Sequence, residues 1–347
     1  MIDVSKLRKW SPPEGWLAID TVDVHTEGEP LRIILDGYPT LEGGTVLEKR
    51  AFAREQVDHF RKSLMWEPRG HHDMYGALIV EPDSPESHFG VIFLHNEGYS
   101  TGCGHAVLAL TKTFVETGLI EMKEEVTPVV MDVPSGTVHA EAISENGRVT
   151  GARFRNVPSF VQLLDGEVDV PAYGTVQYDL AFGGAFYAFV NVNEIGLDAV
   201  PRNSASLVSA GMAIRKTVAK AVTMDHTSEP EMNHLYGTIF FADSNKPKVH
   251  SRHVCIFADG QIDRCPTGTG VSARLAILHE RSEAKLNETI VIDSILGTSF
   301  TGRVVDTLTV NSRQAVIPEI GGKSYITGRQ TFVIDPDDPL KEGFILK

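Results

Sequence analysis

Short apolar runs recur along the chain, and polar residues, glycine or proline separate most of them. The clearest runs span residues 33–35, 77–80, 91–94, 129–131, 185–190 and 254–257. Runs of this length that are rich in Val, Ile and Phe are typical of strands buried in a sheet. The pattern therefore predicts a protein with many short strands.

Two longer apolar segments predict helices. The first spans residues 106–115 and stops before Gly118, and the second spans residues 271–278. Glycine just past the last apolar residue is a common helix end. Both segments are apolar nearly all round, which indicates helices enclosed by sheet. Each follows a glycine-rich loop, at residues 101–105 and 263–270.

The order of strands, glycine-rich loop, buried helix and strands occurs twice. Cys103 and Thr267, at matching places in the two loops, lie 164 residues apart, about half of the 347-residue chain. A repeat of this kind indicates two similar halves whose loops meet at a cleft. We predict an N-terminal half at residues 1–181, joined by residues 334–347, and a C-terminal half at residues 182–333.

Charge and cysteine content limit the classes of partner and the cellular compartment that we expect for this protein. The chain has 32 Lys and Arg against 46 Asp and Glu, and this net charge of -14 disfavours nucleic acid and anionic membranes as partners. The first ten residues lack the apolar core of a signal peptide, and no apolar run is long enough to span a bilayer. Cys103, Cys255 and Cys265 form neither a disulfide framework nor a CxxC pair. We therefore expect a cytoplasmic protein.

Cys103 is the main candidate for chemistry. It lies between Gly102 and Gly104 at a predicted helix start, where free N–H groups and the helix dipole should lower the pKa of a thiol. Such a thiol can act as a base or a nucleophile, whereas an isolated cysteine is more often a small buried residue. The same N–H groups can bind a carboxylate or a phosphate. Neither loop has a GxxxxGK[ST] or GxGxxG pattern, so a carboxylate is the better hypothesis.

Three other loop residues could serve the same site. His105 and Asp263 suit an ammonium or imino group, although each also has an ordinary role in a helix cap or a turn. Thr267 alone would most often be a helix cap. The run 71–73, His-His-Asp, lacks metal-ligand spacing because adjacent side chains on a strand or turn point apart, and no GxSxG motif occurs. We expect no metal ion.

Four segments, 23–30, 67–76, 102–105 and 263–270, resemble the proline racemase family in content and order. This resemblance implies the diaminopimelate-epimerase-like α/β fold, an α+β arrangement of two pseudo-symmetric domains. In each domain an antiparallel sheet wraps around a central helix. The resemblance also implies catalysis without a cofactor.

The resemblance assigns roles to the loop residues. Racemases of the family have cysteine in both loops, whereas Thr267 is typical of the family's trans-3-hydroxy-L-proline dehydratases. A threonine hydroxyl does not titrate near neutral pH, so it is a poor second acid or base. The implied catalytic residues are Cys103 and Thr267. The implied substrate-binding residues are Gly104, His105, Gly268 and Thr269 for the carboxylate, His105 and Asp263 for the ring nitrogen, and Tyr75 and Phe257 for the ring.

The chain departs from the family pattern at two positions, and two alternative functions stay open. Tyr75 stands where the racemases have phenylalanine, and we expect its hydroxyl to bind the 3-hydroxyl of the substrate. Cys265 stands where the family usually has serine, and we expect it to point away from the site. A proline or hydroxyproline racemase or epimerase stays open, as does a binding protein without turnover. The expected partners are an imino acid and a second copy of the chain in a homodimer.

Overall fold

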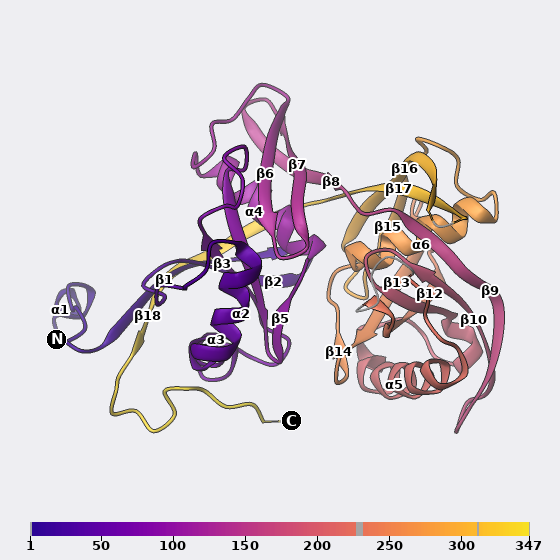
Figure 1. The fold of residues 1–347 in the computed structure, drawn as a ribbon. Helices are drawn as coiled ribbons and strands as arrows, with labels where there is room; N and C mark the ends of the chain where they lie inside the picture. The colour runs from indigo at the N-terminus through magenta and orange to yellow at the C-terminus, as the bar shows by residue number, and fades with distance from the viewer. Residues whose placement is uncertain (1, 227–231, 311, 347) are drawn as a thin grey trace.

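The protein consists of two strand-rich bodies that lie side by side (Figure 1). The computed structural model describes residues 2–226, 232–310 and 312–346. Hydrogen bonds link all 18 strands of these residues into one sheet system. In the same residues, no helix combines the length and the hydropathy needed to cross a bilayer.

The first body contains the strands from the N-terminal part of the chain and one strand from its end. Helices α2 and α3 pack on its outer side through Val46, Ala53, Leu64 and Met65. Its strands are β1 Leu17–Thr26, β2 Glu29–Asp36, β3 Tyr75–Val80, β4 Phe89–His95, β5 Gly98–Ser100, β6 Val126–Val133, β7 Gly136–Glu145, β8 Arg148–Arg155 and β18 Ser324–Ile334. Its helices are α1 Ser5–Arg8, α2 Val46–Gln56, α3 Asp58–Met65 and α4 Gly104–Glu116.

The second body contains nine strands and two long helices among the described residues. Helix α5 packs against β12 and β13 along one side of this body (Figure 1). Its strands are β9 Ser159–Val170, β10 Gly174–Phe182, β11 Phe186–Asn191, β12 Leu235–Asp243, β13 Ser251–Phe257, β14 Gln261–Ile262, β15 Ile290–Asp293, β16 Ser299–Val310 and β17 Arg313–Gly322. Its helices are the short η1 Val192–Ile195 and η2 Pro201–Asn203, followed by α5 Ser204–Ala221 and α6 Gly268–Glu280.

The predicted strands and helices are confirmed. Five of the six predicted runs lie inside β2, β3, β4, β6 and β13, and the sixth overlaps β11 with a shift of one residue. The two predicted helices are the cores of α4 and α6. Gly118 follows α4 with a φ of 77°, a left-handed conformation that glycine adopts without strain.

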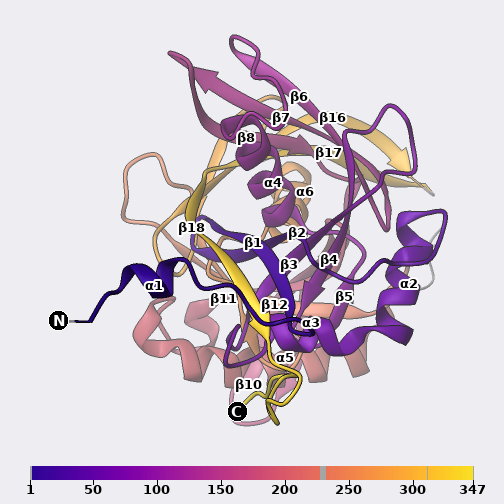
Figure 2. The same ribbon diagram turned by 90° about the vertical axis from the view of Figure 1, so that its left-hand side faces the viewer.

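Helices α4 and α6 form the two centres of the fold. Every residue of α4 from His105 to Val115 is buried, and so is α6 from Gly270 to Leu278. Strands β1, β2, β7, β8 and β18 enclose α4, and β9, β10, β11, β16 and β17 enclose α6. Figure 2, a view from the side of the first body, shows α4 in front of α6, each inside the strands of its own body. Each fully buried leucine of α4, such as Leu108 or Leu110, stabilises the fold by roughly 1.5–3 kcal/mol.

Strand pairing favours a different division of the chain from the one predicted. The predicted boundary at residue 181 puts β9 and most of β10 in the first half, but β9 pairs with β17 and β10 pairs with β11. Strand β18 pairs with β1 along its length, from Leu17↔Ile334 to Thr26↔Ser324. We therefore propose boundaries between β8 and β9 and between β17 and β18, in place of those at residues 181 and 333.

Candidate functional site

The two glycine-rich loops meet at the start of α4 and α6. Cys103 is the N-cap residue of α4 and Thr267 is the N-cap residue of α6, and neither side chain caps its helix. A Cβ atom added to Gly104 would lie 3.5 Å from the Cα of Gly268, and one added to Gly268 would lie 3.5 Å from the Cα of Gly104. A Cβ atom at either position would therefore be in van der Waals contact with the opposite helix start. The free N–H groups of both helices can therefore face one small anion.

A cavity of about 320 Å³ lies at this meeting point. Residues from both bodies line it, and all nine residues singled out in the sequence are among them: Tyr75, Cys103, Gly104, His105, Phe257, Asp263, Thr267, Gly268 and Thr269. The structure thus brings together residues that lie up to 194 positions apart in the chain. Sequence reasoning did not single out Glu29, Ser100, Tyr187 and Tyr236, which line the same cavity.

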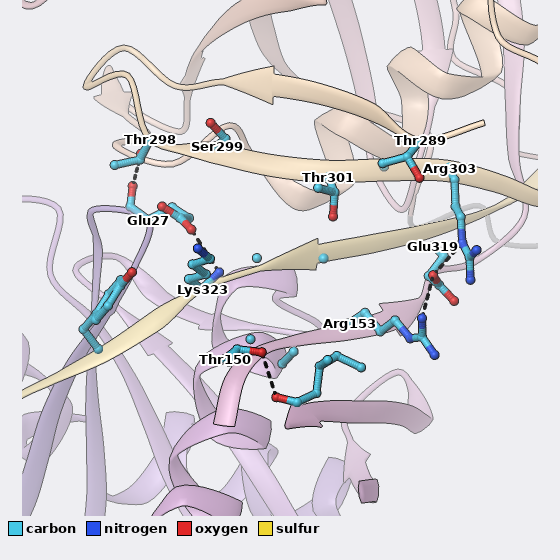
Figure 3. Close-up of a pocket in the computed structure, with 17 residues that line it drawn as sticks. Glu27, Thr150, Arg153, Thr289, Thr298, Ser299, Thr301, Arg303, Glu319 and Lys323 are labelled. Carbon is cyan, nitrogen blue, oxygen red and sulfur yellow. Dashed lines mark hydrogen bonds and ion pairs between the residues drawn. The ribbon is translucent and has the colours of Figure 1, made fainter. Parts of the chain in front are cut away.

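A second cavity, of about 590 Å³, holds none of these nine residues (Figure 3). It lies among β8, β16 and β17. Its arginines are engaged with acidic side chains, because the Glu319 carboxylate accepts a hydrogen bond of 2.7 Å from Arg303 and Arg153 donates to Glu141. The chemistry suggested by the sequence therefore belongs to the smaller cavity.

Cys103 is protonated in the cavity at neutral pH. Burial raises the pKa of its thiol to about 12, although the neighbouring Ala106 amide favours the thiolate. The expected lowering of this pKa is wrong, because removal from water outweighs the helix N-terminus. The carboxyl groups of Asp263 and Glu29 raise the pKa further.

His105 is neutral and lies against the thiol. Its Nδ1 is 3.1 Å from the Cys103 sulfur, and burial lowers the pKa of the imidazole to about 3. A hydrogen bond to the Pro30 carbonyl opposes this shift. The backbone carbonyl of His105 accepts a hydrogen bond of 2.9 Å from the Thr26 hydroxyl. The ring is therefore fixed from two sides as an uncharged partner of the thiol.

Thr267 faces Asp263. The Thr267 hydroxyl donates a short hydrogen bond to the Asp263 carboxylate. Its φ of 67° is unusual for a β-branched residue, and such strain costs of the order of 1–3 kcal/mol. Burial raises the pKa of Asp263 to about 6, while the bond from Thr267 and the charge of Arg264 act in the opposite direction. The proton of the Thr267 hydroxyl is thus engaged in a hydrogen bond to the Asp263 carboxylate.

The two aromatic candidates come from opposite bodies. The Tyr75 hydroxyl donates a hydrogen bond of 2.6 Å to the Ser100 hydroxyl, and its ring meets His105 edge-on at 4.8 Å between centroids. Phe257 stacks on Tyr236, with 5.5 Å between centroids. Tyr75 therefore lies on the Cys103 side, and Phe257 extends from β13 in the second body.

Cys265 borders the cavity, but its side chain belongs to the buried core cluster that contains Val271 and Leu275, so the expectation that it points away stays a prediction. Its side chain is nearly fully buried, and its sulfur accepts a hydrogen bond of 3.4 Å from the Thr267 amide. The left-handed backbone at Thr267 bends the loop back over this sulfur. Burial raises the pKa of the Cys265 thiol well above its ordinary value, which leaves it protonated.

Two of the missed residues hold the loops in place. The Tyr187 hydroxyl lies 2.7 Å from the Thr269 hydroxyl, and a backbone amide of the threonine loop donates to Glu29. Glu29 lies inside segment 23–30, but nothing in its neighbourhood indicates that a glutamate at a strand start is buried. Tyr187 and Tyr236 lie on strands whose apolar neighbours mark them as core residues.

Known proteins resemble this chain over nearly its whole length. A family model described as proline racemase matches residues 21–345. A trans-3-hydroxy-L-proline dehydratase of Colwellia psychrerythraea is 47% identical over 99% of this chain and 97% of its own. One of Homo sapiens is 43% identical over 97% of each chain. The crystal structure of a hydroxyproline epimerase from Agrobacterium vitis, with bound trans-4-hydroxy-L-proline, is similar with a TM-score of 0.84 and 31% identity, over 95% of this chain and 96% of that one.

The protonated state of Cys103 can be measured by alkylation with iodoacetamide. At about pH 8, a thiol with a pKa of about 12 has roughly three orders of magnitude less thiolate than an ordinary cysteine. We expect slow modification at this pH and a rate that rises steeply in more alkaline buffer. Cys103→Ser should remove the reaction, and Cys265→Ser should leave it. Rapid modification of Cys103 that is already complete in neutral buffer would contradict the burial argument.

Proposed function

Because the chain belongs to the proline racemase family, we propose that it dehydrates trans-3-hydroxy-L-proline to Δ1-pyrroline-2-carboxylate as a hydro-lyase. The observation that carries this proposal is the pairing of a thiol on one side of the cavity, Cys103, with a hydroxyl on the other, Thr267. Inversion at Cα needs an acid or base on each face, whereas elimination needs only one. The relatives at 43–47% identity that are named as dehydratases support the same choice over racemisation.

The two helix starts would hold the carboxylate of the substrate. The amides of Gly104 and His105 begin α4, and those of Gly268 and Thr269 begin α6. Unpaired N–H groups at helix N-termini favour an anion, and two such termini would flank the substrate carboxylate. Asp263 and His105 would hold the ring nitrogen, since Asp263 can bear a negative charge and a neutral imidazole has one acceptor nitrogen. Tyr75 and Phe257 would pack against the ring.

Cys103 would act first as the base. A positively charged ring nitrogen that enters beside the sulfur favours the thiolate, which burial disfavours. The thiolate then takes the Cα proton, and the helix N-termini stabilise the negative charge that develops toward the carboxylate.

Cys103 would then act as the acid. In the trans isomer the 3-hydroxyl lies opposite the carboxylate, and therefore on the same face as the Cα hydrogen. The Cα–H electron pair becomes the Cα–C3 double bond as the C3–O bond breaks, and the thiol returns its proton to the departing hydroxyl. Water leaves, and the enamine tautomerises to the cyclic imine. One residue thus serves both ends of a syn elimination.

Tyr75 would recognise the hydroxyl that leaves. Its own proton is donated to Ser100, so its oxygen can accept a hydrogen bond from the 3-hydroxyl of the substrate. Tyr75 lies on the Cys103 side of the cavity, which is the face on which the 3-hydroxyl projects. This arrangement would distinguish a 3-hydroxylated ring from proline.

We also propose that the protein works without a cofactor, in the cytoplasm and as a homodimer. The scheme above moves only a proton and a hydroxyl, so its balance requires no redox or group-transfer partner. Cys103, Cys255 and Cys265 are free thiols, which suits a reducing compartment. The homodimer rests on the family resemblance alone.

The substrate can be identified with an imine assay. We expect product detectable with o-aminobenzaldehyde from trans-3-hydroxy-L-proline, and none from proline or trans-4-hydroxy-L-proline, because only the first has a leaving group next to Cα. Cys103→Ser should abolish product and Cα hydrogen exchange together, and Cys265→Ser should retain both. An inactive wild-type enzyme on the first substrate, or undiminished turnover by Cys103→Ser, would exclude the proposal.

The contribution of Tyr75 can be isolated with Tyr75→Phe. Loss of one hydrogen bond to the 3-hydroxyl should lower kcat/KM for dehydration by roughly tenfold, since such a bond contributes about 0.5–1.5 kcal/mol. Ser100→Ala, which removes the partner of Tyr75 but leaves its oxygen, should have a smaller effect. Steady-state kinetics with unchanged values in Tyr75→Phe would show that the hydroxyl does not contact the substrate.

A further inference from the structure

Glu29 is a buried carboxyl group that the scheme above does not use. It is the first residue of β2, only 2% of its surface is exposed, and it lines the catalytic cavity together with Asp263. Its Oε2 accepts a hydrogen bond of 2.7 Å from the backbone amide of Arg264. Glu29 belongs to the first body and Arg264 to the threonine loop of the second. The Glu29 side chain therefore connects the two bodies at the site.

The turn before Glu29 is held from both sides. On one side, the Thr26 hydroxyl donates to the backbone carbonyl of His105 in the cysteine loop. On the other side, the Thr298 hydroxyl donates to the Glu27 carbonyl at 2.6 Å, and the Lys323 amide donates to the Glu27 carboxylate at 3.0 Å (Figure 3). The position of Glu29 is thus set by contacts with both bodies.

Gly28 allows this turn to approach the threonine loop. Its φ is 103°, and a Cβ atom there would lie 2.8 Å from the Leu296 side chain and 3.5 Å from the Arg264 Cβ. Any other residue would be strained at this φ and would require the exposed Leu296 side chain to move. The carboxyl of Glu29 consequently reaches the backbone of the threonine loop directly, with no space for an intervening side chain.

The cluster around Glu29 contains more carboxyl groups than cations. Glu29, Asp263 and Asp73 are all buried, and Arg264 forms an ion pair of 3.1 Å with Asp73. Among the described residues, neither Glu29 nor Asp263 has an ion pair of its own. Two carboxylates in one dry cavity repel each other, so such a pair retains one proton. Burial and the charge of Asp263 raise the pKa of Glu29 well above its ordinary value, and the pKa of Asp263 is raised only to about 6.

We propose that Glu29 is a positioning residue for dehydration: it keeps one proton beside Asp263, so that the substrate's ring nitrogen meets a single negative charge, and it ties the first body to the threonine loop. This inference rests on the proposed function of the site. The neutral state matters for Cys103, because a charged carboxylate at position 29 would oppose formation of the thiolate. Glu29 therefore acts through Asp263 and Cys103 and does not exchange a proton with the substrate.

Infrared difference spectroscopy in H₂O and D₂O tests the protonation of Glu29 without turnover. At about pH 8, the wild-type enzyme should show the carbonyl stretch of a buried carboxylic acid, which an ordinary glutamate has lost at that pH. Glu29→Gln should lack this band, and Glu67→Gln, a substitution outside the cavity, should retain it. Absence of the band from the wild-type enzyme would overturn the proposal, whether or not the variants fold.

Kinetics separate a positioning role from a role in proton transfer. Glutamine is uncharged and can still accept from the Arg264 amide, so kcat/KM of Glu29→Gln should fall by only about threefold, whereas Glu29→Ala should lose more than about 100-fold. Activity that is largely retained in Glu29→Gln and lost in Glu29→Ala supports a positioning role for Glu29. A loss of about 100-fold or more in Glu29→Gln would instead make Glu29 a catalytic acid and overturn the proposal. Wild-type dehydration, measured separately, reports on the function of the site itself.

Discussion

The contact between the N-termini of α4 and α6 is the constraint on which the site depends. Gly104 and Gly268 approach so closely that a Cβ atom on either would lie 3.5 Å from the other's Cα. Each helix is enclosed by the strands of its own body, so the strands of both bodies fix this approach. Cys103 and Thr267, the residues just before the two helices, therefore face one small cavity from opposite sides.

Burial then determines the charges in the cavity. Exclusion of water makes the His105 imidazole neutral, keeps the Cys103 thiol protonated, and places one proton on the pair formed by Glu29 and Asp263. The helix N-termini supply the remaining positive potential without a titrating group. A zwitterionic imino acid provides the charges that this arrangement lacks, because its carboxylate matches the amides and its ring nitrogen matches Asp263. Reactivity of the thiol is in this way coupled to occupancy of the site.

Much of this arrangement was predictable, because local patterns carry it. The continuous apolar runs identify β2 to β4, β6, β11 and β13, and the two loops identify α4, α6 and the residues that line the cavity. Helix α5 was missed because small residues such as Ala210 and Gly211 weaken its otherwise helical spacing of buried positions. The placement of β9 and β10 depends on pairing with distant strands. The pKa of Cys103 and the burial of Glu29 are tertiary effects, which the flanking residues do not reveal.

In the proposed mechanism, the site exchanges a proton on one face of Cα only. The most direct test is partial conversion of trans-3-hydroxy-L-proline in D₂O, followed by chiral chromatography and mass spectrometry of the recovered substrate. With Cys103 as the single acid and base, the recovered substrate should retain its Cα configuration at every stage of conversion. Accumulation of the Cα epimer carrying deuterium would contradict the claim, because it would require a second proton donor on the Thr267 side.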